Sequence, residues 1–436
     1  MNTLSKNFDF SNMFNEILEN ILSNTSEDIL SVSNELKNNM LSLGAKIFQQ
    51  WLQNKIDAQK TSNTFFSKDE KKRQYYKFSL KEYHKKVYLS AFGEIILKRG
   101  YYSSKWSQKG YYPVDDKCSF LKNYCLPDAA ELICYTTCQL PYDSSQAMLL
   151  KLANVNISTS KIINLTGKIG NKLIEIEENS INETPVYSKS KKKIDRMVIS
   201  MDGAMIHTNE DWKEVKTGII YEVKGDNDNL ISFNKSYVSK IEDADSFSKR
   251  IKREAYRRCY RDAKELIVIG DGAKWIWNIA EREFPHAVKI VDWYHAVEHI
   301  HKIADHLYNH NDTQRHSFAD KCKDYLYNGE IRYMCDFVNA EKIRLNIVEP
   351  YILSAIETEK EYFSKNTNKM QYKAFENNGY PIGSGNIEAA CKQLVQLRLK
   401  RNGMIWKKDG AHCVLEIRCK YLSNRWSEVQ DVIKSA

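Results

Sequence analysis

Three acidic side chains stand in settings where they could do chemistry. Asp202 and Asp271 each end an apolar, β-rich run and are each followed by glycine, whereas Glu388 lies in the first turn of a helix opened by a glycine-rich segment. Carboxylate oxygens are preferred ligands of hard divalent cations. Because a pair of such ions can clamp the attacking and leaving oxygens of a phosphodiester, three converging carboxylates indicate metal-dependent phosphodiester chemistry. We expect Mg²⁺ as the cofactor, with Mn²⁺ as a possible substitute.

An Asp-Gly pair after a strand is also an ordinary turn signal. Taken alone, either aspartate is therefore explained at least as well by a turn as by a metal site. The two pairs occur together with the glycine-rich segment before Glu388, however. Three clustered carboxylates repel one another, and a divalent cation relieves that repulsion. The combination favours a functional site.

Further motifs offer competing chemistry. Asp292 and His295 follow the next apolar run, where they could hold DNA or a metal, or simply start a helix. Residues 295–299 match the H-x-x-E-H zinc-protease pattern, a short motif that often arises by chance. No Walker-type or GxGxxG segment supports nucleotide hydrolysis. Four cysteines without a CxxC pair favour buried thiols over a zinc site: Cys118, Cys125, Cys134 and Cys138.

A mixed α/β region must position the carboxylates. Strands are expected to lead into Asp202, Asp271 and Asp292 and to cover residues 214–223 and 230–241, with helices over 246–261 and 275–284. This β-β-β-α-β-α-β order is the layout of an RNase H-like core, an α/β fold in which functional groups gather at the carboxyl ends of strands. Residues 293–375 are expected to form a helical insertion, followed by a helix over 386–402 that carries Glu388. A final helix is expected over 411–422, and then a short tail.

The part of the chain before this core is expected to contain first helices, then a β hairpin, and then helices again. Residues 12–58 show helical spacing, residues 59–79 are polar and indicate a linker, and residues 86–102 predict a hairpin centred near Phe92 and Gly93. Two helices, 144–155 and 159–178, flank a tight turn. They suggest a helix-turn-helix or an ordinary helical hairpin. The second helix carries candidate DNA contacts: Lys161, Lys168 and Lys172. Residues 182–194, with the lysine run 189–193, indicate another linker.

Composition narrows the choice of partner and compartment. The 436-residue chain has a formal net charge of +9, which favours an acidic partner such as DNA. No run of 18 apolar residues and no signal peptide is visible, so we expect no membrane association and a reducing, cytoplasmic location. The ten cysteines are then expected as thiols.

The core segments resemble a known family. Asp202-Gly203 together with residues 212–218 and 270–277 is similar to the core of DDE transposases of bacterial insertion sequences. Asp292 and His295 resemble the D/C-x-x-H signature of the branch related to eukaryotic Mutator-type elements. Residues 381–388, with Arg398, Gly403, Met404 and Trp406, are similar to the C-terminal Glu block of its ISKra-type group. A zinc-ribbon-like Cys pair common in relatives is missing from residues 102–107, so a structural zinc there is doubtful.

The resemblance implies roles for the residues already named. Asp202, Asp271 and Glu388 would be the metal-binding catalytic triad. Asp292 and His295 would be accessory residues. The implied reaction is cleavage at the ends of an insertion sequence, followed by attack of the freed 3′-OH on target DNA, by a homo-oligomer associated with the bacterial nucleoid. A catalytically inactive DNA-binding protein derived from a transposase is the alternative.

The helix that carries Glu388 also supplies candidate contacts to DNA phosphates. Lys392 lies one helical turn after Glu388 and on the same face. The other candidates, which could equally form a solvated basic face, are Arg398, Lys400 and Arg401. The expected domains are an N-terminal helical region and linker (1–79), a β element with helix-turn-helix (80–185), the catalytic core (195–293 and 376–408), the insertion (294–375) and a C-terminal helix and tail (409–436).

Overall fold

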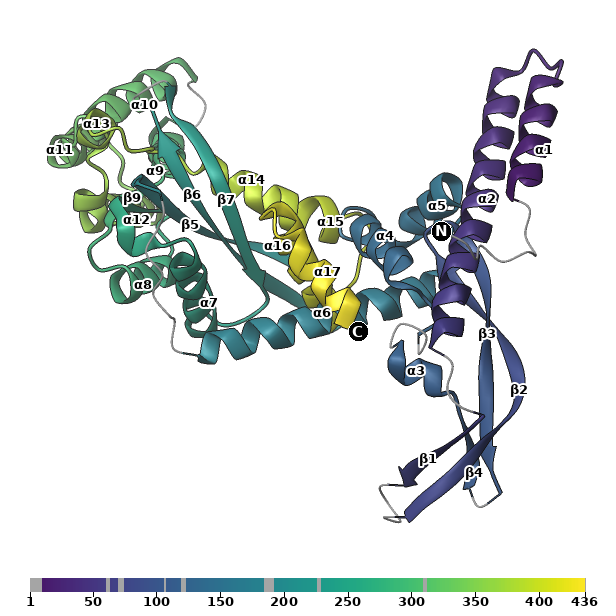
Figure 1. Cartoon of the computed structure of the whole chain (residues 1–436). Helices are drawn as coiled ribbons and strands as arrows, with labels where there is room; N and C mark the ends of the chain where they lie inside the picture. Colours follow the sequence, from purple (N-terminus) through teal and green to yellow (C-terminus); the bar gives the residue numbers. More distant parts are fainter. Residues whose placement is uncertain are drawn as a thin grey trace. The chain divides into compact units, whose positions relative to one another are not determined.

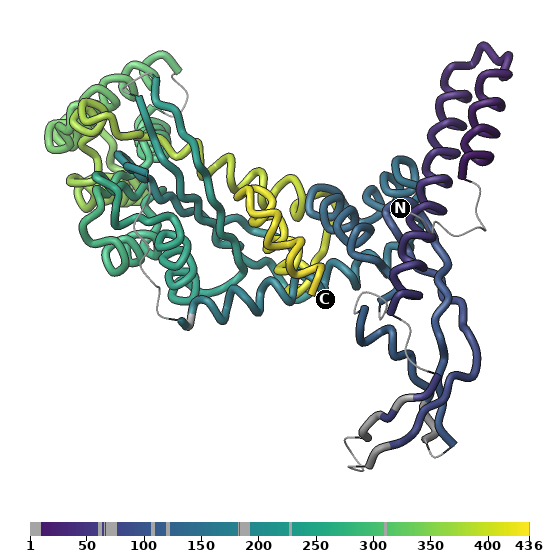
Figure 2. The backbone as a smooth tube through the Cα atoms, viewed as in Figure 1, coloured from purple at the N-terminus to yellow at the C-terminus, as the bar shows by residue number. Residues whose placement is uncertain are grey.

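The chain is a mixed α/β protein with two sheets, and it divides into two compact units (Figures 1 and 2). The first unit comprises residues 1–173 and 426–436, and the second comprises residues 174–425. The computed structural model describes residues 10–59, 63–69, 74–105, 107–118, 123–183, 192–225, 229–308 and 312–435. Over these residues, no helix is both long enough and apolar enough to cross a membrane.

A five-stranded sheet forms the centre of the second unit. Its strands are β5 (Ile194–His207), β6 (Trp212–Lys224), β7 (Ile231–Lys240), β8 (Ala263–Gly270) and β9 (Val288–Val291). They lie in the order β7-β6-β5-β8-β9. β5, β6 and β7 are antiparallel neighbours, whereas β8 is parallel to β5 and β9 is parallel to β8. Val198 and Ile199 of β5 are fully buried, as expected for a central strand covered on both faces. The predicted sequence of strands and helices is confirmed.

Helices cover both faces of this sheet. They include α7 (Ala244–Arg257), α8 (Lys274–Glu283), α14 (Gly385–Cys391) and α16 (Lys408–Leu422). α7 packs against the face of the sheet that carries Gly218. The contact is close, since any side chain at position 218 would collide with Ile251 of α7. Gly218 pairs with Met201, and the next residue of β5, Asp202, points to the opposite face. α14 covers that second face and contacts β5 and β6.

The stretch between β9 and α14 is helical, as predicted. Its helices are α9 (Trp293–Tyr308), α10 (Asp312–Tyr327), α11 (Ile331–Arg344), α12 (Pro350–Asn366) and α13 (Tyr372–Asn377). α9 is the hub of the region, since it packs against both α10 and α12. Ile300 of α9 and Phe363 of α12 are fully buried there. The first turn of α9 follows β9 directly, so this helical region is attached at the edge of the sheet.

The helix predicted over residues 386–402 is shorter and irregular. α14 continues into a π-helical turn (Lys392–Gln396) and then into a short α15 (Leu397–Leu399). Single π-helical turns of this kind are frequent at functional sites, because the wider turn shifts the side chains that follow. The helix predicted over 411–422 is α16. The short tail predicted after it is wrong, because α17 (Trp426–Ser435) follows.

The first unit contains the second sheet, an antiparallel meander in the order β1-β2-β3-β4. Its strands are β1 (Thr64–Asp69), β2 (Gln74–Ser90), β3 (Gly93–Ser104) and β4 (Ser107–Tyr111). The predicted hairpin is confirmed at the turn between β2 and β3, where Gly93 has φ +105°. The linker predicted over residues 59–79 is wrong, because β1 and the start of β2 lie within it. Few apolar residues alternate in that stretch, so the sequence carries a weak strand signal.

Helices complete the first unit. They are α1 (Phe10–Leu22), α2 (Ile29–Ala58), α3 (Pro113–Lys117), α4 (Pro127–Thr137), α5 (Tyr142–Ala153), the part of α6 (Thr159–Asn182) up to residue 173, and α17. The predicted helix pair is confirmed as α5 and α6, and Asn154 ends α5 in the left-handed conformation. Leu149 and Ile162 join these two helices to a core that includes Ile133 of α4. Of the predicted linker over 182–194, residues 184–191 and most of its lysine run lie outside the described residues.

A buried carboxylate fastens the C-terminal half of α6 within the second unit. Glu177 accepts hydrogen bonds from both terminal nitrogens of Arg257, at 3.0 and 2.9 Å, and from Lys420 Nζ at 3.4 Å. Burial alone would raise the pKa of Glu177, but the charges of Lys420 and Arg257 outweigh it and lower that pKa to about 2. The carboxylate therefore stabilises the fold in its ionised form.

This pKa shift predicts how the stability of the protein depends on pH. The folded pKa of Glu177 lies below the unfolded value of 4.5, so its contribution is complete above pH 4.5 and is lost as the pH falls towards 2. We expect Glu177→Gln to lower the free energy of unfolding at pH 7 by about 3 kcal/mol, since Arg257 and Lys420 each lose one of their carboxylate partners. Urea denaturation between pH 7 and pH 3 measures this. Glu175→Gln, an exposed change on the same helix, is the control, and equal unfolding curves for the two variants would refute the assignment.

Candidate active site

Neighbouring parallel strands bring two of the predicted carboxylates together. The last parallel pair between β5 and β8 is Ser200 with Ile269. Asp202 and Asp271 each lie two residues beyond this pair, so they occupy equivalent positions on adjacent strands. The strand predicted to end at Asp202 is longer than expected, because β5 continues to His207 by pairing with β6 alone. Asp202 therefore lies where β5 parts from β8, and Asp271 lies just after the end of β8.

The third carboxylate arrives on α14. Cys391 of this helix donates a hydrogen bond from Sγ to Asp202 Oδ2 at 3.4 Å, and Glu388 lies one turn earlier on the same helix. Burial raises the pKa of Asp202, and the negative charges of Asp271 and Glu388 raise it further, against the opposing hydrogen bonds from Gly203 N and Cys391. The register of β5 and β8 and the Cys391–Asp202 hydrogen bond bring three segments that are far apart in the sequence next to one another.

Neutral donors hold the three carboxylates. Asp202 Oδ1 accepts from Gly203 N at 2.6 Å, and Asp271 Oδ1 accepts from Ala273 N at 2.8 Å. Ser384 Oγ donates to Glu388 Oε1 at 2.7 Å. Among the residues that the structure describes, no three or more His, Cys, Asp or Glu side chains have their donor atoms gathered as metal ligands.

The donor set fits a hard divalent cation, because it consists of carboxylates and because the charge on Asp202 is opposed by its acidic neighbours. Such an ion would need the carboxylates to exchange their present hydrogen bonds for metal ligation. The sulfur of Cys391 is a poor ligand for such an ion. Burial is the main cause that raises the pKa of this thiol, so it remains protonated and serves as a hydrogen-bond donor to Asp202.

Asp292 organises the turn that leads into α14. Its side chain is almost fully buried and accepts hydrogen bonds from Ser384 N and, at 2.6 Å, from His295 N. Its own backbone N donates to Gly270 O at 2.9 Å, beside Asp271. One carboxylate thus joins the end of β9, the start of α9 and the glycine-rich turn before Glu388. Both oxygens of Asp292 are engaged in these hydrogen bonds.

His295 lies on the first turn of α9 with its side chain 37% exposed. The Nδ1 atom of His295 lies 3.4 Å from Glu298 Oε2, and the centroid of its ring lies 5.4 Å from that of the His299 ring. His299 Nδ1 is engaged by the Glu359 carboxylate, and its ring stacks on Tyr362. The zinc-protease interpretation of residues 295–299 therefore gains no support, because His299 has protein partners on both its edge and its face.

Tyr362 is a site residue that sequence analysis missed. It comes from α12 of the helical region, and its hydroxyl donates to the backbone O of Asp271 at 3.3 Å. Burial, followed by the charge of Asp271, raises the pKa of Tyr362, so the phenol stays neutral. Gly272 has φ +101°, and a Cβ there would lie 2.9 Å from the Tyr362 ring. Glycine after Asp271 is thus required by both backbone conformation and space. In the sequence, the Asp-Gly pair was the only sign that position 272 requires glycine.

A buried lysine lies on the other face of the sheet from Asp202, across from Gly203. Lys216 pairs with Gly203 across β5 and β6, is 7% exposed, and its Nζ lies 5.1 Å from the centroid of the Trp275 ring. It donates to Glu214, whose Oε1 would be 2.2 Å from a Cβ at Gly203. Gly203 therefore makes room for the Glu214 carboxylate. Sequence analysis did not identify Lys216 as buried, because a strand pattern does not reveal which lysines are buried.

The four residues after Glu388 that were predicted to contact phosphates differ in their exposure. Lys392, Lys400 and Arg401 are exposed. Arg398 is fully buried, and its guanidinium lies 5.0 Å from the centroid of the Trp406 ring. The prediction of a direct DNA contact for Arg398 is therefore wrong. The residue packs in the core against Trp406, away from the face that Glu388 and Lys392 share.

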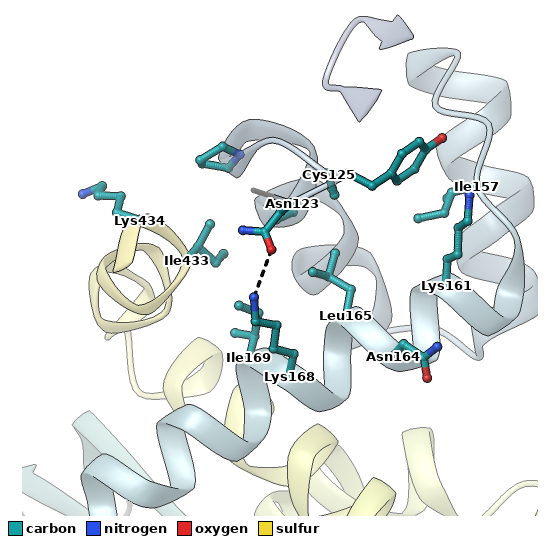
Figure 3. A pocket seen from close by; sticks show the side chains of 13 residues that line it. Asn123, Cys125, Ile157, Lys161, Asn164, Leu165, Lys168, Ile169, Ile433 and Lys434 are labelled. Atoms are coloured by element: carbon teal, nitrogen blue, oxygen red, sulfur yellow. Dashed lines mark hydrogen bonds between the residues drawn. The ribbon is translucent and has the colours of Figure 1, made fainter. Parts of the chain in front are cut away.

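The three lysines predicted to read DNA lie on α6 and are engaged within the first unit. Lys161 Nζ lies 4.0 Å from the centroid of the Tyr124 ring, Lys168 Nζ donates to Asn123 Oδ1 at 3.1 Å, and Lys172 Nζ donates to Ser435 O at 3.2 Å. Lys161 and Lys168 line a cavity (Figure 3). The lysine face of α6 is thus turned towards other parts of its own unit.

The cysteines are free thiols, as predicted. Cys134 and Cys138 are buried in the first unit, and Cys118 and Cys125 are partly buried. Burial raises the pKa of Cys125 to about 12, so this sulfur is protonated and unsuited to zinc.

The structure therefore defines a mixed α/β protein with three acidic side chains at the junction of a β-sheet and a helix. The chain belongs to the uncharacterised protein family UPF0236, whose family model matches residues 26–432. A search of curated proteins finds no significant match.

Proposed function

We propose that this protein is a DDE transposase that cleaves DNA strands and transfers their 3′-OH ends to target DNA. The observation that carries the proposal is the meeting of Asp202, Asp271 and Glu388 from β5, the end of β8 and α14. The strand order β7-β6-β5-β8-β9, with three antiparallel and then two parallel strands, supports an RNase H-like core.

In this proposal Asp202, Asp271 and Glu388 would hold Mg²⁺. The bound cation supplies charge stabilisation for the attacking and leaving oxygens of the phosphodiester. The chain supplies the positions: Asp292 fixes the turn before Glu388, and Tyr362 fixes the backbone at Asp271. No covalent link between protein and DNA is required, so no nucleophilic side chain is needed.

DNA would be held by cationic groups near the site. Lys392, Lys400 and Arg401 are exposed on the segment that follows Glu388 and would contact the phosphate backbone. The formal net charge of +9 adds a general attraction. Binding that depends on such contacts weakens steeply as the salt concentration rises. A homo-oligomer would bring the two ends of a mobile element together.

The test of this proposal is a strand-cleavage assay with DNA that flanks the gene. End-labelled fragments from both sides are incubated with the full-length protein in Mg²⁺ or in EDTA. The proposal predicts cuts at fixed positions within inverted repeats, with 3′-OH ends, in Mg²⁺ only. Specific binding without any cut in Mg²⁺ or Mn²⁺ would instead support a DNA-binding protein without catalysis.

A further inference from the structure

A cavity of about 260 Å³ opens on the first unit, remote in sequence from the three carboxylates (Figure 3). It lies between α6, the segment that leads into α4, and the end of α17. The walls include Ile157, Leu165 and Ile169, together with Ile433 of α17. Ligand sites are usually concave, mainly apolar surfaces with a few polar groups, and this cavity is at the small end of their size range. It therefore suits one ring system rather than a large ligand.

The polar groups around the cavity are cationic or neutral. Lys161 and Lys168 of α6 lie along one side, and Lys434 lies at the opposite rim, with no acidic residue among the 13 described residues that line the cavity. Asn123 and Asn164 add amide groups. An apolar hollow edged by ammonium and amide groups fits an anionic ligand with a flat, apolar body and polar edges.

A nucleotide has this chemistry. Its base offers apolar faces and hydrogen-bonding edges, and its phosphate offers the negative charge. Bases stack on aromatic side chains, and Tyr124 lines the cavity with its ring under the ammonium group of Lys161. Asparagine amides are suited to the edges of bases. A base that is paired within a duplex cannot enter such a hollow, because its faces are covered by its neighbours.

We propose that this cavity binds an unpaired nucleotide of DNA, with the base between Tyr124 and Leu165 and the phosphate on Lys161 and Lys168. The inference rests on the proposed function, since it takes DNA as the substrate. It assigns the first unit the task of holding a single-stranded nucleotide, which adds recognition of DNA form to the catalysis assigned to the second unit.

Binding in EDTA tests the proposal separately from cleavage. The probes are a blunt duplex and the same duplex with a four-nucleotide 3′ overhang, measured by fluorescence anisotropy with the full-length protein. We expect the overhang to bind about tenfold more tightly, the gain typical of one stacked base. Leu165→Phe, which fills the cavity, and Lys161→Gln should each bring this ratio close to one. Leu165→Phe, which removes no charge, should also leave binding of the blunt duplex unchanged.

Matched controls lie on the same helix pair but outside the cavity. Ile163→Phe and Lys151→Gln, both at exposed positions, should keep the tenfold ratio. A 4-thiothymidine in the overhang should crosslink the unaltered protein within Tyr124 or residues 157–169. An equal affinity for both probes, or crosslinks confined to other segments, would overturn the proposal. So would displacement of the overhang by equimolar dTMP, which would identify a site for free nucleotides. If Mg²⁺-dependent cleavage persists in any of these cases, the proposed function stands without the cavity.

Discussion

Asp202→Asn and Asp271→Asn are each expected to lower the rate of strand cleavage in Mg²⁺ by about 10³-fold or more. An amide keeps the size of the side chain but removes the negative charge that a divalent cation needs. Asp202 is partly buried and its charge is opposed by those of Asp271 and Glu388, so the neutral variant also loses an unfavourable charge and should fold at least as well. The cleavage assay described above measures the rate, and thermal unfolding checks that the fold is intact.

Asp195→Asn is the control for this prediction. Asp195 lies on the same strand as Asp202, but it is exposed and pairs with Lys193. The Asp195→Asn variant should cleave DNA at the rate of the unaltered protein. If both site variants cleave element-end DNA as fast as this control, the assignment of the three carboxylates is wrong. If no variant and no control cleaves DNA, while all bind it alike, the protein binds DNA without catalysis.

Asp292→Asn is expected to lower the cleavage rate by about 10² and to raise the Mg²⁺ concentration needed for half of the maximal rate. The carboxylate accepts from Ser384 N and His295 N, and an amide can accept at only one of these two positions. The turn before Glu388 would lose one anchor, and residues behind metal ligands typically contribute 10- to 100-fold. The rate is measured over a Mg²⁺ titration.

The Mg²⁺ dependence separates positioning from a merely structural role. A structural role would lower the unfolding temperature of Asp292→Asn and leave the Mg²⁺ requirement of the folded protein unchanged. Asp336→Asn, an exposed change in the helical region, is the control and should alter neither quantity. An unchanged Mg²⁺ requirement in Asp292→Asn would rule out the positioning role.

The local pattern of the sequence was enough to predict the acidic triad as a candidate site. Apolar runs that end on Asp-Gly identified the segments of Asp202 and Asp271, because buried parallel strands are nearly continuous in apolar residues. The register between β5 and β8, which places these residues side by side, is a long-range property that the local pattern does not contain. The continuation of β5 beyond Asp202 depends on its antiparallel partner β6, and was missed for the same reason.

The errors have physical causes too. Arg398 was predicted to contact DNA because it follows Glu388 and Lys392 in a basic segment, but its side chain is fully buried, which the local sequence does not reveal. β1 was missed because its segment is mostly polar. Tyr362 could not be found, because it reaches Asp271 from a helix 91 residues away in the chain. Long-range contacts of single side chains leave little signal in one sequence.

Binding of Mn²⁺ tests the central claim most directly. Electron paramagnetic resonance measures free Mn²⁺ as the metal is titrated into the full-length protein, without any need for a known DNA substrate. We predict saturable binding that is lost when Asp202, Asp271 and Glu388 are replaced together by the corresponding amides and is kept in Asp195→Asn. Equal Mn²⁺ binding by the unaltered protein and the triple variant, or no binding by either, would contradict the account.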